Sequence, residues 1–391
     1  MKGKRILLCC NRAMNIGGIE KALTTLLAEF NTTENEVVLV INSASGAFYE
    51  ELPTENIQMF CTNTINPTQY LKDDIKHLRL GKVISGLWHR LMLRLDRGWY
   101  AQLMHTYHIN KRGMIFPGHF DCAIAYSTDY ADMAMVVNAD ADKRVAFVHG
   151  DATYYPRPAK LNDKLVCGMD MIYSVSYEAR DKFLQMHPGY KGQTDIIHNV
   201  VIKEDILNKA QAEPADMCID GVLTLCTVAR MVPEKGQYMI PGIAARLCRD
   251  GLRLRWYLVG DGSDRERVEK EIRTYGMEDC VILLGRRSNP YPYMKNCDLY
   301  VQTSFHEAYC LAVAEARVLH RPIVTTNATG VSEQFNGGDG LVVSQTADAL
   351  YEGIRKLLED EELRRSYSQK LAQTPMFEED DLPKLYQYIM E

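Results

Sequence analysis

Residues 304–316 read Ser304-Phe305-His306-Glu307-Ala308-Tyr309-Cys310-Leu311-Ala312-Val313-Ala314-Glu315-Ala316. An apolar run over residues 299–301 precedes this stretch, a polar turn carries Glu307, and helical spacing opens at about Leu311. This strand, turn and helix form the unit from which parallel α/β sheets are built. The two carboxylates, Glu307 and Glu315, can accept hydrogen bonds from hydroxyls, and the first amides of the helix can hold a phosphate. The stretch therefore predicts a site for a ligand that has both groups, such as a nucleotide sugar.

Length and composition limit the classes of protein to which the chain can belong. Its 391 residues suit two domains of about 200 residues each. The hydrophobic content of 46% and the charged content of 25% are typical of globular protein, and the net charge of −6 gives no reason to expect a nucleic-acid partner. Eleven cysteines form no C-x-x-C pair and mostly lie in apolar runs, which indicates buried free thiols in a reducing compartment.

The N-terminal residues are basic and then apolar, as in a signal peptide. The apolar run ends after five residues, at Asn11-Arg12, which is too short for a secretory core. No stretch approaches the roughly 20 apolar residues that a membrane span needs. We therefore expect a cytoplasmic protein.

Short β-rich runs alternate with helical patterns along the whole chain, which predicts an α/β fold with two doubly wound parallel sheets. The expected domains are 1–199, with a C-terminal helix at about 377–391 that crosses back onto it, and 200–376. Ligand is expected at the carboxyl ends of the strands. Strands are expected at residues 5–10, 36–41, 122–126, 144–148, 171–175, 195–197, 221–227, 255–259, 281–284, 298–303 and 322–326, and helices at residues 20–30, 236–249 and 264–275.

Residues 72–112 differ from the rest of the chain. They hold nine Lys and Arg against three Asp, with Trp88 and Trp99 among the apolar side chains. A basic helix that carries tryptophans is attracted to an anionic membrane surface. A solvated basic helix whose aromatic residues pack on the domain core has the same pattern. Both interpretations stay open.

Two cations follow an expected strand of the second half. Arg230 comes just after the strand and Lys235 stands at a helix start, where Gly236 allows close approach of backbone. Together they could neutralise a diphosphate without a metal, although a surface pair would look the same. The sequence offers only Asp140-Ala141-Asp142 as a metal pattern, in an expected polar turn, so we predict neither a metal nor a cofactor.

Two glycine turns and one histidine also follow expected strands. Gly17 and Gly18 lie between the first strand and its helix, and Gly260 begins a Gly-Asp-Gly turn. Neither turn has the full spacing of a dinucleotide fingerprint. His149 follows the strand at residues 144–148 and is expected to face the cleft, where it could orient a sugar hydroxyl or the acceptor; a structural role is the alternative.

Taken together, these motifs resemble the retaining glycosyltransferases of family 4, whose two Rossmann-like domains form the GT-B architecture. The resemblance runs almost from end to end. Besides the residues above it includes Val175-Ser176, Leu284-Gly285, the run at residues 289–294 and Gly330-Val331-Ser332-Glu333. Each motif is short, but their order and spacing are specific.

The resemblance implies a role for each matching residue. The proposed catalytic group is His149, Glu307, Arg230 and Lys235, with Glu307 at the transferred sugar and the two cations at the donor diphosphate. The implied donor-binding set has backbone and side-chain members: Gly17, Gly18, Arg230, Lys235, Gly260, Gly285, Arg286, Glu307, Tyr309, Cys310, Leu311 and Glu315. Within it, the amides of residues 309–311 would hold the phosphates, Glu315 the ribose hydroxyls, and the turn at residues 285–287 would border the base. No enzymic nucleophile is implied, because in this family the leaving phosphate helps to deprotonate the acceptor.

The resemblance implies transfer from a nucleoside-diphosphate sugar, with UDP-sugar favoured, to a glycan or lipid-linked saccharide in surface polysaccharide synthesis. The enzyme would work in the cytoplasm, at the inner face of the membrane if residues 72–112 bind it. Three positions depart from the family pattern. Ala308 stands where the family usually has glycine, Cys310 stands where it has glycine or proline, and Asn199-Val200 replaces the usual Asn-Gly. A nucleotide-sugar-binding protein with weak catalysis, or an epimerase of the same fold, is therefore the alternative.

Overall fold

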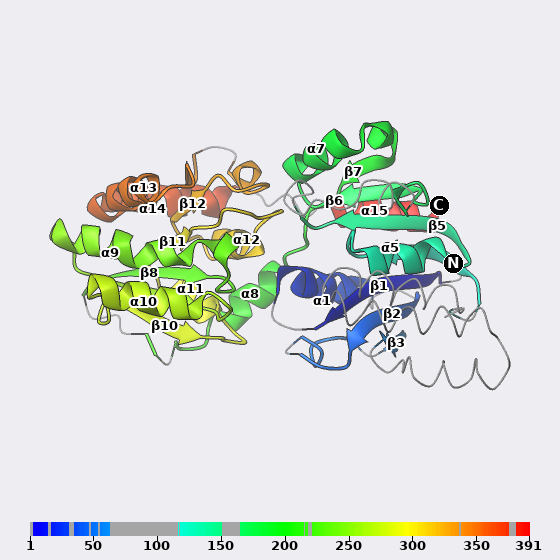
Figure 1. Cartoon of the computed structure of the whole chain (residues 1–391), viewed down its shortest axis with the longest axis horizontal. Helices are drawn as coiled ribbons and strands as arrows, with labels where there is room; N and C mark the ends of the chain where they lie inside the picture. The colour runs from blue at the N-terminus through cyan, green and yellow to red at the C-terminus, as the bar shows by residue number, and fades with distance from the viewer. Residues whose placement is uncertain are drawn as a thin grey trace, which may run out of the picture. The chain divides into compact units, whose positions relative to one another are not determined.

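The computed structural model describes residues 3–14, 17–30, 35–46, 48–53, 55–62, 116, 118–150, 165–214, 216–217, 221–335, 338–374 and 381–391. The chain forms two compact units, drawn in Figure 1. The first consists of Met1–Ser174, Lys182–Ile197 and Pro383–Glu391, and the second of Val175–Asp181 and His198–Leu382. The basic segment 72–112 lies outside the described residues.

The first unit contains a seven-stranded parallel sheet in the order β3-β2-β1-β4-β5-β6-β7. Its central strand β1 pairs with β2 on one side and β4 on the other, and residues 6–10 of β1 are fully buried. A continuous apolar run is what a parallel strand covered on both faces requires. The strands are β1 (Arg5–Ala13), β2 (Glu36–Ser43), β3 (Ile57–Cys61), β4 (Phe120–Ala125), β5 (Ala141–Val148), β6 (Met171–Ser174) and β7 (Thr194–Ile196).

Helices connect and cover these strands. In the described residues they are α1 (Gly18–Phe30), α5 (Tyr130–Val137), α7 (Tyr177–Met186), the 3₁₀ helix η2 (Pro188–Gln193) and the C-terminal α15 (Asp381–Met390). The first half of α7, up to Asp181, belongs to the second unit. Most of α15 belongs to the first unit, where Lys143 Nζ donates to the carbonyl of Tyr388 at 2.6 Å and lies 4.9 Å from the centre of its ring.

The second unit contains a six-stranded parallel sheet in the order β10-β9-β8-β11-β12-β13. Its strands are β8 (Leu223–Val228), β9 (Leu254–Val259), β10 (Val281–Gly285), β11 (Leu299–Gln302), β12 (Ile323–Thr326) and β13 (Leu341–Val343). Its helices are α8 (Lys203–Lys209), η3 (Pro233–Lys235), η4 (Gln237–Met239), α9 (Ile240–Arg249), α10 (Arg265–Tyr275), α11 (Tyr291–Lys295), α12 (Leu311–Val318), η5 (Ser332–Gln334), α13 (Ala347–Glu359) and α14 (Glu361–Gln373).

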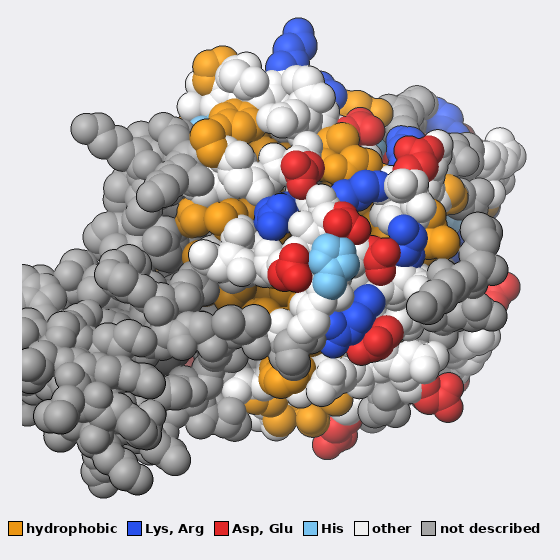
Figure 2. All heavy atoms as spheres, turned by 90° about the vertical axis from the view of Figure 1, so that its right-hand side faces the viewer, with side chains coloured by type: hydrophobic (Ala, Val, Ile, Leu, Met, Phe, Trp, Pro, Cys, Tyr) orange, Lys and Arg blue, Asp and Glu red, His pale blue; other side chains and the backbone are white. Residues whose placement is uncertain are grey.

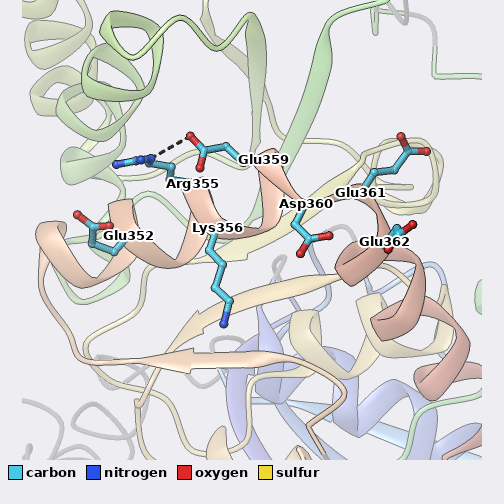
Figure 3. Close-up of a pocket in the computed structure, with 7 residues that line it drawn as sticks. All are labelled: Glu352, Arg355, Lys356, Glu359, Asp360, Glu361 and Glu362. Atoms are coloured by element: carbon cyan, nitrogen blue, oxygen red, sulfur yellow. Dashed lines mark hydrogen bonds and ion pairs between the residues drawn. The ribbon is translucent and has the colours of Figure 1, made fainter.

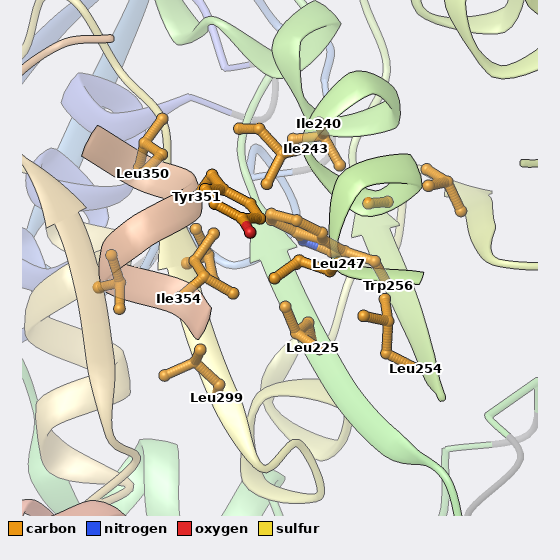
Figure 4. Packing of buried hydrophobic residues seen from close by; sticks show 14 of the residues in the cluster. Leu225, Ile240, Ile243, Leu247, Leu254, Trp256, Leu299, Leu350, Tyr351 and Ile354 are labelled. Carbon is orange, nitrogen blue, oxygen red and sulfur yellow. The ribbon is translucent and has the colours of Figure 1, made fainter. Parts of the chain in front are cut away.

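Successive residues of these strands enter two different cores. Trp256 packs with Leu247 of α9 and Tyr351 of α13, as Figure 4 shows, whereas the adjacent Tyr257 packs in a cluster with Tyr300 and residues of α8, α11 and α12. Neighbouring side chains of a strand point to opposite faces. The second sheet therefore has a layer of helices on each face, and the predicted doubly wound α/β fold is confirmed.

Each of the eleven predicted strands coincides with a strand of the structure to within three residues at each end. Two strands were missed, β3 and β13, and both lie at an edge of a sheet. Edge strands are short and only half covered, so their apolar pattern is weak. The helix predicted at residues 236–249 begins later, at Ile240, because Gly236 has a left-handed φ of 65° between η3 and η4.

The amino ends of β1, β4 and β5 carry mixed charges. His119 lies 3.2 Å from Asp140 and 3.1 Å from Asp142, and Lys4 lies 3.4 Å from Asp121. Figure 2 shows this side of the molecule, where acidic and basic side chains surround a histidine. The Asp-x-Asp pattern thus brackets the start of β5 instead of lying in a free turn, and no group of side chains within the described ranges is arranged to hold a metal ion.

Among the described residues there is no helix with both the length and the apolar character needed to span a bilayer.

Candidate functional site

The carboxyl ends of the second sheet gather most of the predicted site residues. Because all six strands are parallel, the loops after them emerge at one edge of the sheet. Arg230 and Lys235 follow β8, Gly260 follows β9, Gly285 ends β10 and Glu307 follows β11.

Lys235 and Glu307 form an ion pair with 2.6 Å between Nζ and Oε1. Their side chains are only 15% and 10% exposed, so water screens the pair weakly. Lys235 Nζ also lies 3.4 Å from the carbonyl of His306. The sequence had assigned one residue to the phosphates and the other to the sugar, and the structure brings the two charges together.

Glu307 is held from behind by residues that the sequence analysis missed. Ser304 Oγ donates to Glu307 Oε1 at 2.7 Å, and Gln302 Nε2 lies 3.5 Å from the same atom. Tyr300 in turn donates to Gln302 Oε1 at 2.8 Å. The available signal was polar residues at every second position where an apolar strand ends, which places Tyr300, Gln302 and Ser304 on one face.

The loops that carry Lys235 and Glu307 are bound to each other by hydrogen bonds to two backbone carbonyls. Phe305 N donates to the carbonyl of Glu234 at 2.8 Å, and Thr303 Oγ1 donates to that of Lys235 at 2.7 Å. A Cβ on Gly236 would come within 2.4 Å of the carbonyl oxygen of Thr303. Glycine at this position is therefore required for contact between the loops, as well as for its positive φ.

Gly260 has a similar structural task. Its φ is 140°, and a Cβ there would lie 1.9 Å from the carbonyl oxygen of Ala229. Gly260 N donates to the carbonyl of Gly285 at 2.8 Å, and φ of Gly285 is 70°. Both glycines thus hold together the loops after β8, β9 and β10, next to Arg230.

The arginines around these loops fall into two groups. Arg230 and Arg286 are exposed, and neither side chain has a hydrogen bond or ion pair with any described residue. Arg287 is instead bound to Asp216 at 2.5 Å and to the hydroxyl of Tyr293 at 3.2 Å. Arg230 and Arg286 are therefore available to a ligand without first breaking a contact to the described part of the chain.

The turn before α12 has a left-handed residue at Cys310, with φ of 67°. Ala308, the other residue that departs from the family pattern, does not have a positive φ. Burial, and next the charge of Glu307, raise the pKa of the Cys310 thiol.

The side chains of this turn are mostly covered. Tyr309 is 2% exposed, Glu315 of the following helix is 4% exposed and Leu311 is half-buried, so backbone is the part of residues 309–311 that is best suited to meet a ligand.

A charged cluster lies beside this turn. His198 is buried, with Nδ1 2.5 Å from Asp381 and Nε2 3.5 Å from Glu333, and its ring lies 5.5 Å from that of Tyr309. Burial lowers the pKa of His198, but the hydrogen bonds to Asp381 and Glu333 outweigh it and raise the pKa to about 9. His198 is therefore charged at neutral pH.

The remaining predicted residues lie in the first unit. Gly17 and Gly18 have no positive φ. A Cβ on Gly17 would meet only the carboxylate of Glu20, at 2.3 Å, and one on Gly18 would meet nothing described. Neither residue needs to be glycine for the fold of the described chain.

His149 packs against aromatic rings, 4.6 Å from Tyr126 and 5.8 Å from Phe147. Its Nε2 is buried and has no hydrogen-bond partner among the described residues. Burial, together with the charge of Arg12, lowers the pKa of His149 to about 3. The ring is neutral at physiological pH, where it can exchange hydrogen bonds but is a very weak base.

Near the carboxyl ends of β1 and β4 the structure adds a buried carboxylate, Asp132, which accepts from Asn11 N and from Ser127 Oγ, both at 2.7 Å. Burial and the nearby charge of Asp129 raise the pKa of Asp132 to about 7. A lone Asp within an apolar helix was the sequence signal.

The pocket drawn in Figure 3 lies elsewhere, along α13 and the start of α14. Charged side chains line it, five acidic and two basic: Glu352, Arg355, Lys356, Glu359, Asp360, Glu361 and Glu362. None of the predicted site residues is among them.

Comparison with known proteins places this geometry in context. Residues 219–374 match the family described as glycosyl transferases group 1. The matching segment lies within the second unit and includes Lys235 and Glu307.

An N-acetylgalactosamine-N,N'-diacetylbacillosaminyl-diphospho-undecaprenol 4-alpha-N-acetylgalactosaminyltransferase of Campylobacter jejuni is 27% identical over 45% of this chain and 47% of its own. The capsular polysaccharide biosynthesis glycosyltransferase CapM of Staphylococcus aureus is 25% identical over 36% of this chain and 37% of its own. The chain thus spans about half or less of the length of these curated relatives.

The fold is matched over nearly the whole chain. The crystal structure of Anabaena HepE in complex with UDP and glucose superposes with a TM-score of 0.70, at 17% identity, over 99% of this chain and 98% of that one. Together with the two sheets described above, this identifies the fold as GT-B.

Proposed function

We propose that this protein is a glycosyltransferase that moves a sugar from a nucleoside-diphosphate sugar to a glycan or lipid-linked saccharide during surface polysaccharide synthesis. The observation that carries the proposal is the Lys235–Glu307 pair inside the segment that matches glycosyl transferases group 1. One charge suits a phosphate and the other suits sugar hydroxyls, and both lie at the carboxyl ends of a parallel sheet.

Within this proposal the protein's own cations take the place of a metal. Lys235 and the exposed Arg230 would neutralise the charge that develops on the leaving diphosphate. The amides at the start of α12 would bind the same phosphates, since the first amides of a helix have no partners within it. Glu307 would hold the transferred sugar, and Glu315 the ribose.

The stereochemical part of the proposal is transfer with retention, by the front-face route of the family that the sequence resembles. In that route the leaving phosphate accepts the acceptor's proton, so no enzymic base is needed. The low pKa of His149 is compatible with such a route, in which the ring would orient a hydroxyl as a neutral group.

The proposals for the base of the donor and for the acceptor are supported by similar proteins. HepE is described in complex with UDP, which supports a UDP-sugar donor, and the C. jejuni relative is named for a diphospho-undecaprenol substrate, which supports a lipid-linked acceptor. For such an acceptor we also propose contact between residues 72–112 and the cytoplasmic face of an anionic membrane.

The experiment that tests the proposal has two stages. Purified protein is first screened by thermal shift against UDP-, GDP- and ADP-sugars, because a bound ligand raises the melting temperature by mass action. Release of nucleoside diphosphate from the stabilising donor is then measured with Lys235→Met, Glu307→Gln and the surface control Lys356→Ala.

We expect the first two variants to lose at least 100-fold in rate and the control to keep full activity. An excess of EDTA should leave most of the wild-type activity. Donor binding without turnover in the wild type would favour the weak or non-catalytic alternative, and complete loss with EDTA would refute the proposal that cations of the protein replace a metal.

A further inference from the structure

The 3₁₀ helix η5 holds the turn at residues 309–311 from behind. Gln334 of η5 is 1% exposed, and its Nε2 donates to the carbonyl of Tyr309 and lies 3.4 Å from that of Cys310. Its Oε1 is buried and has no partner among the described residues, so the amino group of this side chain makes both contacts. A buried amide orients in this way because the opposite orientation would set its oxygen against two carbonyl oxygens.

These two carbonyls lie on either side of the φ and ψ bonds of Cys310, a non-glycine residue with positive φ. Cys310 has a left-handed backbone, which a residue with a Cβ adopts at a cost in free energy. The carbonyl of Cys310 also accepts from Val313 N at 3.0 Å and Ala314 N at 3.3 Å, so it begins the hydrogen bonding of α12. The conformation at Cys310 therefore sets the direction in which the first amides of α12 point.

The segment that carries Gln334 is itself anchored. Gly330 leaves room for the carbonyl of Ala308, which would lie 2.0 Å from a Cβ at that position. Glu333 accepts from Tyr177 N at 2.9 Å and pairs with His198. Residues 330–334 are thus anchored on both sides, and the turn at residues 309–311 packs against them.

We propose that Gln334 is a positioning residue for the donor: its side-chain amide holds the carbonyls of Tyr309 and Cys310 and so keeps the first amides of α12 directed at the donor diphosphate. The role in donor binding rests on the proposed function. The role in holding the turn does not, because the contacts belong to the protein alone.

The test is a double-substitution cycle in the full chain. Gln334→Met removes the amide and keeps an unbranched chain of similar length, and Gln334→Leu serves as a second version should the first fail to fold. Each is combined with Cys310→Gly, which lets the turn adopt a left-handed φ without help. Affinity for UDP is measured by calorimetry, and the unfolding equilibrium is measured in urea.

We expect Gln334→Met alone to weaken UDP binding about five- to tenfold and to raise the unfolding constant by a similar factor. In the presence of Cys310→Gly both losses should shrink to about twofold. If Gln334→Met acted only through a packing defect, Cys310→Gly would not relieve the loss. The fold-changes of the two single substitutions would then multiply in the double variant, and that result would overturn the proposal.

Gln345 supplies a matched control, because its Nε2 donates to the carbonyl of Phe305 in the same loop at 2.8 Å. The loss caused by Gln345→Leu should not be relieved by Cys310→Gly, and equal relief would overturn the proposal. A wild type that binds none of UDP, GDP and ADP would refute the proposed function and the donor role. The unfolding cycle would then decide by itself whether Gln334 holds the turn.

Discussion

Replacing Lys235 by methionine tests whether the central ion pair is a device for binding phosphate. Methionine keeps an unbranched chain but leaves Glu307, which is 10% exposed, without its cation. Removing one partner of a buried pair costs about 3–5 kcal/mol. Ser304 and Gln302 continue to donate to Glu307, so we expect a loss of about 2–3 kcal/mol of unfolding free energy.

The reverse change, Glu307→Gln, should cost less. The glutamine oxygen can still accept from Ser304, and Lys235 keeps the carbonyl of His306 at 3.4 Å, so we expect a loss of about 1–2 kcal/mol. With both substitutions no unpaired charge remains. The double variant should therefore recover about 2 kcal/mol relative to the sum of the single losses.

The losses of unfolding free energy are measured by urea unfolding, with tryptophan fluorescence as the signal. Trp256 is fully buried in the core of the second unit, and Trp88→Phe with Trp99→Phe would isolate its signal. Titration with UDP measures the effect of the same variants on donor binding. Lys235→Met should weaken UDP binding by about 10- to 100-fold, because one charged hydrogen bond is lost. Glu307→Gln should leave UDP binding unchanged or tighter, because the carboxylate competes with phosphate for Lys235. Single losses that add to within about 0.5 kcal/mol, or weaker UDP binding in Glu307→Gln, would refute the reasoning.

Three further predictions use the same preparation. The raised pKa of His198, about 9 against an ordinary 6.5, gives stability that is complete below pH 6.5 and lost as pH rises through 9. The unfolding free energy should fall by at most about 3 kcal/mol between pH 6.5 and 10, and His198→Asn should flatten that slope. Gly330→Ala should destabilise by at least about 3 kcal/mol, because its Cβ would meet the carbonyl of Ala308, whereas Gly221→Ala, with a similar φ and open space, should cost about 1–2 kcal/mol in the same melts. Replacing the three arginines within residues 90–97 by glutamine should reduce sedimentation with anionic vesicles, and unchanged sedimentation would argue for ordinary packing of that segment.

Every interior strand was predicted from the sequence, whereas two of the four edge strands, β3 and β13, were missed. β1 and β11 are covered on both faces, so the buried positions 6–10 and 299–301 form continuous apolar runs that stand out in the sequence. β3 and β13 each pair on one side only and contain partly exposed residues, so their apolar pattern does not differ from that of a loop. The predicted start of the helix at residue 236 was wrong, because Gly236 forms a turn there. Its left-handed φ depends on the backbone of another loop that packs against it, which the sequence does not show.

For the site, the sequence identified residue types and their order along the chain. It led to Lys235 and Glu307 because charged residues after apolar strands of a parallel sheet must emerge at a common edge. It missed Gln302, Ser304 and Gln334, whose importance lies in the atoms that they contact. The partners of Gln302 and Ser304 lie within five residues but depend on how the turn after β11 folds, and the partners of Gln334 lie 24 and 25 residues away.

The sequence alone therefore determined the α/β class, the parallel direction of the strands and the loops in which charge collects, because these follow from periodicity and from the length of apolar runs. Tertiary structure alone decided that Lys235 contacts Glu307, that the left-handed residue is Cys310 and not Ala308, and that His149 is held neutral among aromatic rings. Each of these depends on distances between segments far apart in the chain, and electrostatic and steric energies change steeply over such distances.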